Sequence, residues 1–318
     1  MFTFAGKLHI NNFSCIMANV IKIKKGLDIN LKGKASDVLL NGGKSESYAI
    51  VPDYYNGILP KVVAKVGEKV KAGSVLMIDK NRPEIKFVSP VSGEVTAVNR
   101  GEKRKVLSIV VKPDAQIEYE EFGKKNVASL QGAEVKEVLL NAGMWPFIKQ
   151  RPYDIVAAPL DTPRDIFVSA FYSAPLAPNF DFIVKGQEAD FQTGLNALAK
   201  LTNGKVYVGV RSGSVVSGMK GVEIVEVEGP HPAANVGVQI NHIKPVNKGE
   251  VVWTVNPADV IVIGRLFNKG VADFSRMVAI TGSETTERGY VKTISGCTIK
   301  SLVNGKVLGP VSYTHLRA

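Results

Sequence analysis

Aromatic, proline and cationic residues gather in one short stretch, residues 143–153, which read GMWPFIKQRPY. Trp145 and Phe147 offer apolar surface, while Lys149 and Arg151 offer positive charge. Together they could line an apolar pocket in which Arg151 orients the polar head group of a ligand. A rigid loop that packs over a sheet would use the same residue types, so the spacing leaves both interpretations open.

A second stretch, residues 228–242, reads EGPHPAANVGVQINH and places His231 between two prolines. His242 follows eleven positions later. Two histidines do not make a zinc site, which takes three or four protein ligands. A hydrogen-bonded histidine inside the fold is the more ordinary outcome, and we predict no metal site here.

Residues 50–112 carry a two-part pattern, and each half has short β-branched runs, glycine turns and one Gly-Glu pair. This pattern favours a small antiparallel barrel or sandwich, and it resembles the biotinyl/lipoyl-like barrel-sandwich domain. Lys80 would then be the candidate for a covalent lipoyl or biotinyl arm. However, Pro83 stiffens the expected hairpin, and Ser89 lies farther from Lys80 than in the usual lipoyl pattern. We therefore interpret the module as structural, with modified Lys80 as the alternative.

The usual phosphate and redox motifs are missing from the sequence. No Gly-x-Gly-x-x-Gly occurs, and the triplet at residues 43–45 has Val38 where a P-loop needs its first glycine. Residues 209–218 (GVRSGSVVSG) could cradle a phosphate through backbone amides, or form a plain mobile loop. The two cysteines, Cys15 and Cys297, are too few for an iron–sulfur cluster. We predict no catalytic residue and no flavin, iron–sulfur or metal site in this chain.

Strand-like and helix-like segments alternate after residue 113, which indicates an α/β layer built of βαβ units. Leu130, Val135, Val138 and Leu139 predict a helix over residues 127–141, with Gly143 as its C-terminal cap. The apolar run at 259–264 suits a buried strand or a core helix. We further expect strands at 154–158, 165–170, 205–210, 222–228 and 276–280, and a helix at 188–201.

The net charge of +11 is concentrated near the N-terminus, because residues 17–112 hold 18 basic and 9 acidic side chains. The lysines fall at turns and alternate strand positions instead of clustering with aromatics, so we exclude a nucleic-acid partner. They form either solvated strand faces or a basic docking surface for anionic lipid headgroups or an acidic partner. No apolar run approaches the ~20 residues that cross a bilayer, and residues 1–16 do not form a signal peptide. A cytosolic location is the expectation.

Several of these segments, taken in order, resemble one family: the A subunits of the sodium-translocating NADH:quinone reductases. The resemblance extends over residues 17–308 and is more specific than any single motif. The segments are residues 20–28 (VIKIKKGLD), 144–147 (MWPF), 150–152 (QRP), 161–168 (DTPRDIFV), 228–233 (EGPHPA) and 260–267 (VIVIGRLF).

The resemblance implies a mixed α/β chain: a lipoyl-like barrel-sandwich module, a Rossmann-like layer related to the complex I flavoprotein subunit, and the start of a β-grasp-like domain. It implies a redox-inert, peripheral subunit on the cytoplasmic face of the bacterial inner membrane, within an enzyme that is a sodium-transporting NADH:ubiquinone reductase. Flavins and iron–sulfur centres would belong to the other subunits, and the main partner would be the membrane-embedded B subunit. For ubiquinone, which the family is proposed to contact, our candidates are Trp145, Arg151 and His231.

The expected division is 17–112 for the barrel module, 113–270 for the Rossmann-like domain and 271–308 for the start of the β-grasp-like domain. Residues 1–16 precede the start implied by the family, and residues 309–318 depart from its pattern. We therefore expect an N-terminal extension, a foreign tail and a third domain cut short. Two alternatives remain at this point: an Rnf-type electron-transport subunit, and a stand-alone carrier modified at Lys80.

Overall fold

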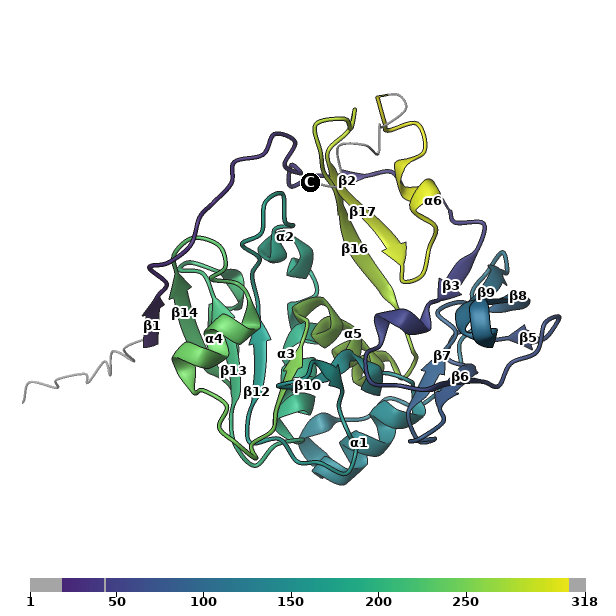
Figure 1. Cartoon of the computed structure of the whole chain (residues 1–318), viewed down its shortest axis with the longest axis horizontal. Coiled ribbons are helices and arrows are strands. Elements are labelled where there is room, and N and C mark those ends of the chain that lie inside the picture. The colour runs from purple at the N-terminus through teal and green to yellow at the C-terminus, as the bar shows by residue number, and fades with distance from the viewer. Residues whose placement is uncertain (1–18, 43, 309–318) are drawn as a thin grey trace, which may run out of the picture.

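The computed structural model describes residues 19–42 and 44–308 (Figure 1). The predicted extension at 1–16 and the predicted tail at 309–318 lie outside the described residues. The chain is a mixed α/β protein with a barrel-sandwich part, a larger α/β part and a small C-terminal part. This architecture confirms the predicted fold class.

The barrel-sandwich part consists of two antiparallel sheets, ordered β3-β9-β8-β5 and β4-β6-β7. Their apolar residues alternate inward, so that Leu76, Ile109 and Val111 are completely buried between the sheets. The strands are β3 (Tyr48–Ile50), β4 (Pro60–Val62), β5 (Lys69–Val70), β6 (Val75–Asp79), β7 (Lys86–Val88), β8 (Gly93–Arg100) and β9 (Val106–Pro113).

The α/β part is built on a seven-stranded sheet in the order β1-β14-β13-β12-β15-β10-β11. Strands β1, β14, β13, β12 and β15 are parallel, and β10 runs antiparallel to both of its neighbours. The strands are β1 (Asn19–Lys22), β10 (Ile148–Arg151), β11 (Ile155–Val156), β12 (Ile166–Ser169), β13 (Val206–Val210), β14 (Glu223–Glu228) and β15 (Val252–Val255).

Helices cover both faces of this sheet, and the apolar run at 259–264 is the middle of a core helix. Leu139, Leu195 and Ile263, from three different helices, pack into the main core on one face. Ile240 packs against Phe167 and Val252 on the other. The helices are α1 (Gly132–Asn141), α2 (Phe180–Val184), α3 (Glu188–Ala199), α4 (Val236–Ile243) and α5 (Pro257–Lys269). Short 3-10 turns occur at Pro52–Tyr54, Glu102–Arg104, Val127–Ser129, Trp145–Phe147 and Val215–Gly218.

Helix α1 begins later than predicted. Gln131 is its N-cap, and the Glu134 side chain returns to the Gln131 amide at 2.7 Å, so residues 127–129 form a separate turn. The predicted glycine cap is present: Gly143 has φ +66°, and Met144 donates to the Leu139 carbonyl at 2.9 Å. This cap turns the chain towards the next segment of the α/β part.

The C-terminal part contains strands β16 (Ser275–Ile280) and β17 (Gly289–Ile294) and helix α6 (Ile299–Val303). Its third strand, β2 (Leu39–Leu40), comes from near the N-terminus and pairs parallel with β17. Within the expected barrel module at 17–112, the strands of the barrel itself begin only at Tyr48. Strands β1 and β2 instead complete the open edges of the other two sheets, where unpaired backbone groups accept an added strand.

Candidate functional site

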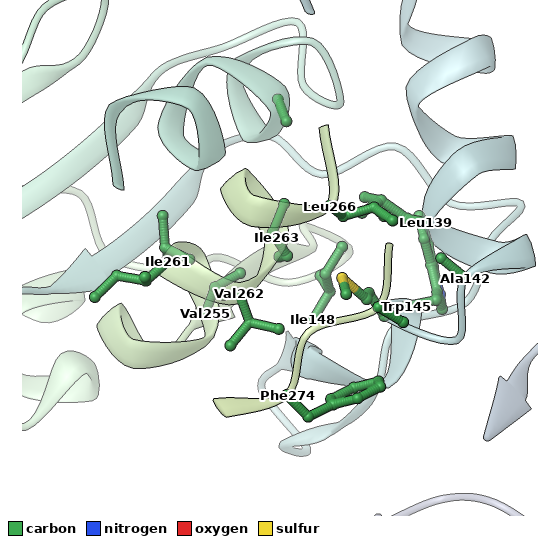
Figure 2. Close-up of a cluster of buried hydrophobic side chains, with 14 of the residues drawn as sticks. Leu139, Ala142, Trp145, Ile148, Val255, Ile261, Val262, Ile263, Leu266 and Phe274 are labelled. Atoms are coloured by element: carbon green, nitrogen blue, oxygen red, sulfur yellow. The ribbon is translucent and has the colours of Figure 1, made fainter. Parts of the chain in front are cut away.

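Trp145 belongs to the core of the α/β part. Its side chain is 0% exposed, and its indole nitrogen donates to the Ala157 carbonyl at 2.8 Å. The ring also meets Trp253 edge to face, with centroids 5.4 Å apart. Figure 2 shows it among Leu139, Ala142 and the other buried side chains of this cluster. Trp145 therefore agrees with the second interpretation of this loop, in which its residues pack over a sheet.

His231 lies half-buried in the loop between β14 and α4. Its Nδ1 atom is 3.0 Å from the Ser173 hydroxyl, and its backbone amide donates to the Asp28 carboxylate at 2.8 Å. The His231 carbonyl accepts from Leu27 at 2.9 Å. His231 thus ties the N-terminal segment to this loop.

Arg151 is the one predicted site residue that lines a described cavity. It ends β10, and its Nε atom is 3.4 Å from Asp154 Oδ1. The cavity, of about 610 Å³, opens at the carboxyl ends of β12 and β15 and includes Lys149 and Tyr172. The structure therefore brings neither Trp145 nor His231 to Arg151: Trp145 is buried in the core, and His231 lies in the loop after β14.

A second cavity, of about 360 Å³, lies where all three parts of the protein meet. Phe147, Lys149 and Asp259 line both cavities, so the two adjoin. Five aromatic residues are among those that line this second cavity. The lining includes Tyr54, Tyr55 and Phe87 from the barrel-sandwich part, Phe147 and Lys149 from β10 and the turn before it, and Phe274 and Arg276 from the start of β16 and the residue before it.

Asp259 and Arg276 form an ion pair at this junction, with Nη2 and Oδ1 3.0 Å apart. Asp259 stands in the first turn of α5, and burial raises the pKa of its carboxyl group despite the arginine. Burial together with the charge of Asp259 raises the pKa of Tyr55 to about 12. The sequence patterns did not single out these residues, because Tyr55 lies more than 200 positions before Asp259 and Arg276.

The glycine-rich loop at 209–218 is held by its own side chains. Arg211 donates to the Val227 and Gly229 carbonyls at 3.0 and 2.7 Å, and Ser214 donates to the Asp181 carboxylate at 2.6 Å. A carboxylate in this position disfavours a phosphate. Among residues 19–42 and 44–308, no three His, Cys, Asp or Glu side chains come together as a metal site.

Three family models match the chain in the order of its three parts. They are the NqrA N-terminal barrel-sandwich hybrid domain at residues 21–114, the NqrA second alpha/beta domain at 130–272 and the NQRA C-terminal domain at 277–311. The fold and these matches define the class: the chain belongs to the NqrA family.

Three relatives show more particularly which proteins this chain is similar to. The chain is 37% identical over 293 residues to the A subunit of the Na(+)-translocating NADH-quinone reductase of Hahella chejuensis, over 91% of this chain and 65% of the relative. The A subunit of the Neisseria meningitidis enzyme is 35% identical over 91% of this chain and 66% of the relative. That of Photorhabdus laumondii is 35% identical over 91% and 65%. The match thus spans slightly less than two thirds of each relative's length.

In the part of the chain that the structure describes, no helix is both long enough and apolar enough to cross a bilayer.

Proposed function

We propose that this chain acts as a subunit of a sodium-translocating NADH-quinone reductase. The observation that carries the proposal is the ordered match of all three NqrA domains, together with 35–37% identity to named A subunits of such enzymes. In this role the chain is peripheral, lies on the cytoplasmic face of the bacterial inner membrane and is held by other subunits, of which the membrane-embedded B subunit is its main partner. It carries no redox centre, and it contributes to the structure of the complex and to quinone access.

Co-purification tests this role. The tagged chain, expressed with the remaining subunits, is expected to elute from solubilised membranes together with the B subunit. A chain that elutes free of partners would count against the proposal. The visible spectrum of the purified chain separates the Rnf-type alternative, which predicts iron–sulfur absorbance. Intact mass separates the carrier alternative, which predicts an adduct on Lys80.

For quinone access, the cavity at the junction of the three parts suits a planar, apolar ring. Tyr55, Phe87 and Phe274 supply aromatic walls, and Phe147 meets Phe274 edge to face at 6.1 Å. Lys149 and Arg276 also line it, and a cation can donate a hydrogen bond to a quinone carbonyl. Arg151, which the sequence predicted as a site residue, lies on β10 together with Lys149 and lines the adjoining cavity.

Binding of a quinone analogue to the assembled complex tests this assignment. We expect Phe274→Ala and Lys149→Ala each to weaken binding about tenfold, since each removes a wall or a polar contact worth about 1.4 kcal/mol. Trp145→Phe and His231→Ala serve as controls, because neither side chain lines this cavity. If only the two control variants lost quinone-analogue binding, the quinone site would instead lie at the residues predicted from the sequence.

A further inference from the structure

The cavity of about 610 Å³ lies at the topological switch point of the seven-stranded sheet. From β12 the chain builds β13 and β14 on one side, and it returns through α4 to place β15 on the other side of β12. In such sheets a crevice opens at the carboxyl ends of the two diverging strands, and ligands bind there. The cavity is lined by the ends of both strands and by the starts of α4 and α5.

Two cations face this cavity from one side of the sheet. In the register of β10 and β15, Lys149 is opposite Thr254, and Arg151 is opposite Val252. Val252 packs beneath α4, so the side chains at 149 and 151 lie on the α4 face. Because they are two residues apart, both point towards the cavity. The Nε atom of Arg151 is buried and makes no hydrogen bond within the described part of the chain.

Asp154 and Asp259 also line this cavity, and each carboxylate is paired with an arginine. Asp259 is paired with Arg276 at 3.0 Å. Asp154 forms an ion pair with Arg151, with Oδ1 and Nε 3.4 Å apart, although Nε makes no hydrogen bond to it. For Lys149, no carboxylate within 4.0 Å is found in residues 19–42 and 44–308. The charge of Lys149 therefore remains available to an anion in the cavity, together with the Nε–H group of Arg151.

Helix α4 adds backbone donors to the same wall. Its N-cap, Asn235, makes no side-chain cap, and the first amides that bond to the Asn235 carbonyl are those of Val238 and Gln239. The amides of Val236 and Gly237 precede them, and both residues line the cavity. Uncapped amides at a helix start favour an anion. They supplement the two cations, which define the site.

We propose that this cavity binds a phosphate monoester with a ring body, of the size of a nucleoside monophosphate. The phosphate lies between Lys149, Arg151 and the start of α4, and the ring lies against Phe147, Phe171 and Tyr172, which line the same cavity. A bare phosphate would leave most of the volume and all three aromatic side chains without a contact. This site is distinct from the proposed quinone cavity, although the two share Phe147, Lys149 and Asp259.

Calorimetric titration of the full chain with AMP, inorganic phosphate and adenosine tests the proposal. We expect AMP to bind more tightly than phosphate, and adenosine to bind at least tenfold more weakly than AMP. Raising the salt concentration should weaken AMP binding, because salt screens the attraction between charges in a cavity open to solvent. Equal binding of AMP and adenosine would overturn the proposal, as would no binding of AMP at low salt.

Gly237→Glu is the sharpest variant. A Cβ at Gly237 meets no heavy atom within 4 Å, and a carboxylate in the first turn stabilises a helix. The variant should therefore fold at least as well as the parent, yet lose AMP binding because its carboxylate repels the phosphate. Arg151→Ala should weaken AMP binding at least tenfold, while Lys61→Ala, an exposed lysine in the barrel-sandwich part, should leave it unchanged. Unchanged AMP affinity in Gly237→Glu would refute the site. Binding of a quinone analogue by the same variant tests the quinone proposal separately, because Gly237 lines only the larger cavity.

Discussion

A buried arginine joins the α/β part to the C-terminal part through its charge. Arg265 is 4% exposed and makes ion pairs with Asp273 at 3.2 Å and Asp190 at 3.7 Å. Its guanidinium also donates to the Ser275 carbonyl at 2.9 Å. Burial by itself would raise the pKa of Asp273. The hydrogen bonds from Ser275 and Lys269 and the charge of Arg265 outweigh burial and lower this pKa to about 2.

Asp273→Asn is therefore expected to lower the free energy of unfolding by about 2 kcal/mol at pH 7. The folded pKa lies below the ordinary value of 3.8, so the stabilisation is present above about pH 4 and is lost as the pH falls towards 2. Urea unfolding of both proteins between pH 7 and pH 3 measures it. A difference that does not shrink below pH 4 would contradict this assignment. Asp53→Asn, in an exposed ion pair with Lys105, is the control and should cost less than about 1 kcal/mol.

At the scale of elements, the end of α1 sets the course of the chain into the core. Gly143 has φ +66°, and a Cβ there would lie 2.5 Å from Val88 Cγ1 on β7. The glycine therefore has two roles. It ends α1 in the left-handed conformation, and it lets the barrel-sandwich part pack closely against the end of this helix. Trp145 is placed in the core directly after this turn.

Gly143→Ala is expected to destabilise the protein by about 2–4 kcal/mol, from left-handed strain and from overpacking against Val88. Gly67→Ala is the matched control, since Gly67 has φ +87° but open space at its Cβ position, and it should cost only about 1–2 kcal/mol. Thermal unfolding compares the two. Adding Val88→Ala to Gly143→Ala should recover the part of the lost stability that comes from the contact with Val88. An equal loss of stability in Gly143→Ala and Gly67→Ala would show that this contact is unimportant.

At the scale of the whole molecule, the hairpin that carries Lys80 is docked onto the α/β part. Asp79 is 0% exposed and accepts from Arg82 Nε at 2.8 Å. Arg82 in turn donates to the Val156 carbonyl at 3.1 Å, across the boundary between the two parts. Close by, a Cβ on Gly57 would be 2.7 Å from Ile155. Lys80 itself is exposed at the tip of an anchored hairpin.

Arg82→Ala should cost about 3 kcal/mol or more, because it leaves the buried Asp79 carboxylate without its partner. It should also loosen the barrel-sandwich part, so that calorimetry shows a separate, earlier transition for that part. Lys105→Ala, which removes only an exposed ion pair, should keep the melting profile of the parent. A single unchanged transition in Arg82→Ala would mean that other contacts hold the two parts together.

The predictions that held depend on local chemistry. The alternation of residues in 57–111 predicted the barrel strands, the helical spacing and Gly143 predicted the body and end of α1, and six short segments in order predicted the family. The start of α1 was placed too early, because its capping box needs the side chain of Glu134 to fold back on Gln131, which spacing alone did not single out.

By itself, the sequence determined the three-part α/β architecture, the family and the scarcity of redox ligands, because periodicity, turn residues and composition act within short stretches of chain. Tertiary structure decided the rest. It placed Trp145 in the core and His231 in a loop, and it sent β1 and β2 to other sheets. It also brought Tyr55 to Asp259 and Lys149 to the switch point. Such contacts depend on how strands and helices pack across long separations, which no local pattern encodes.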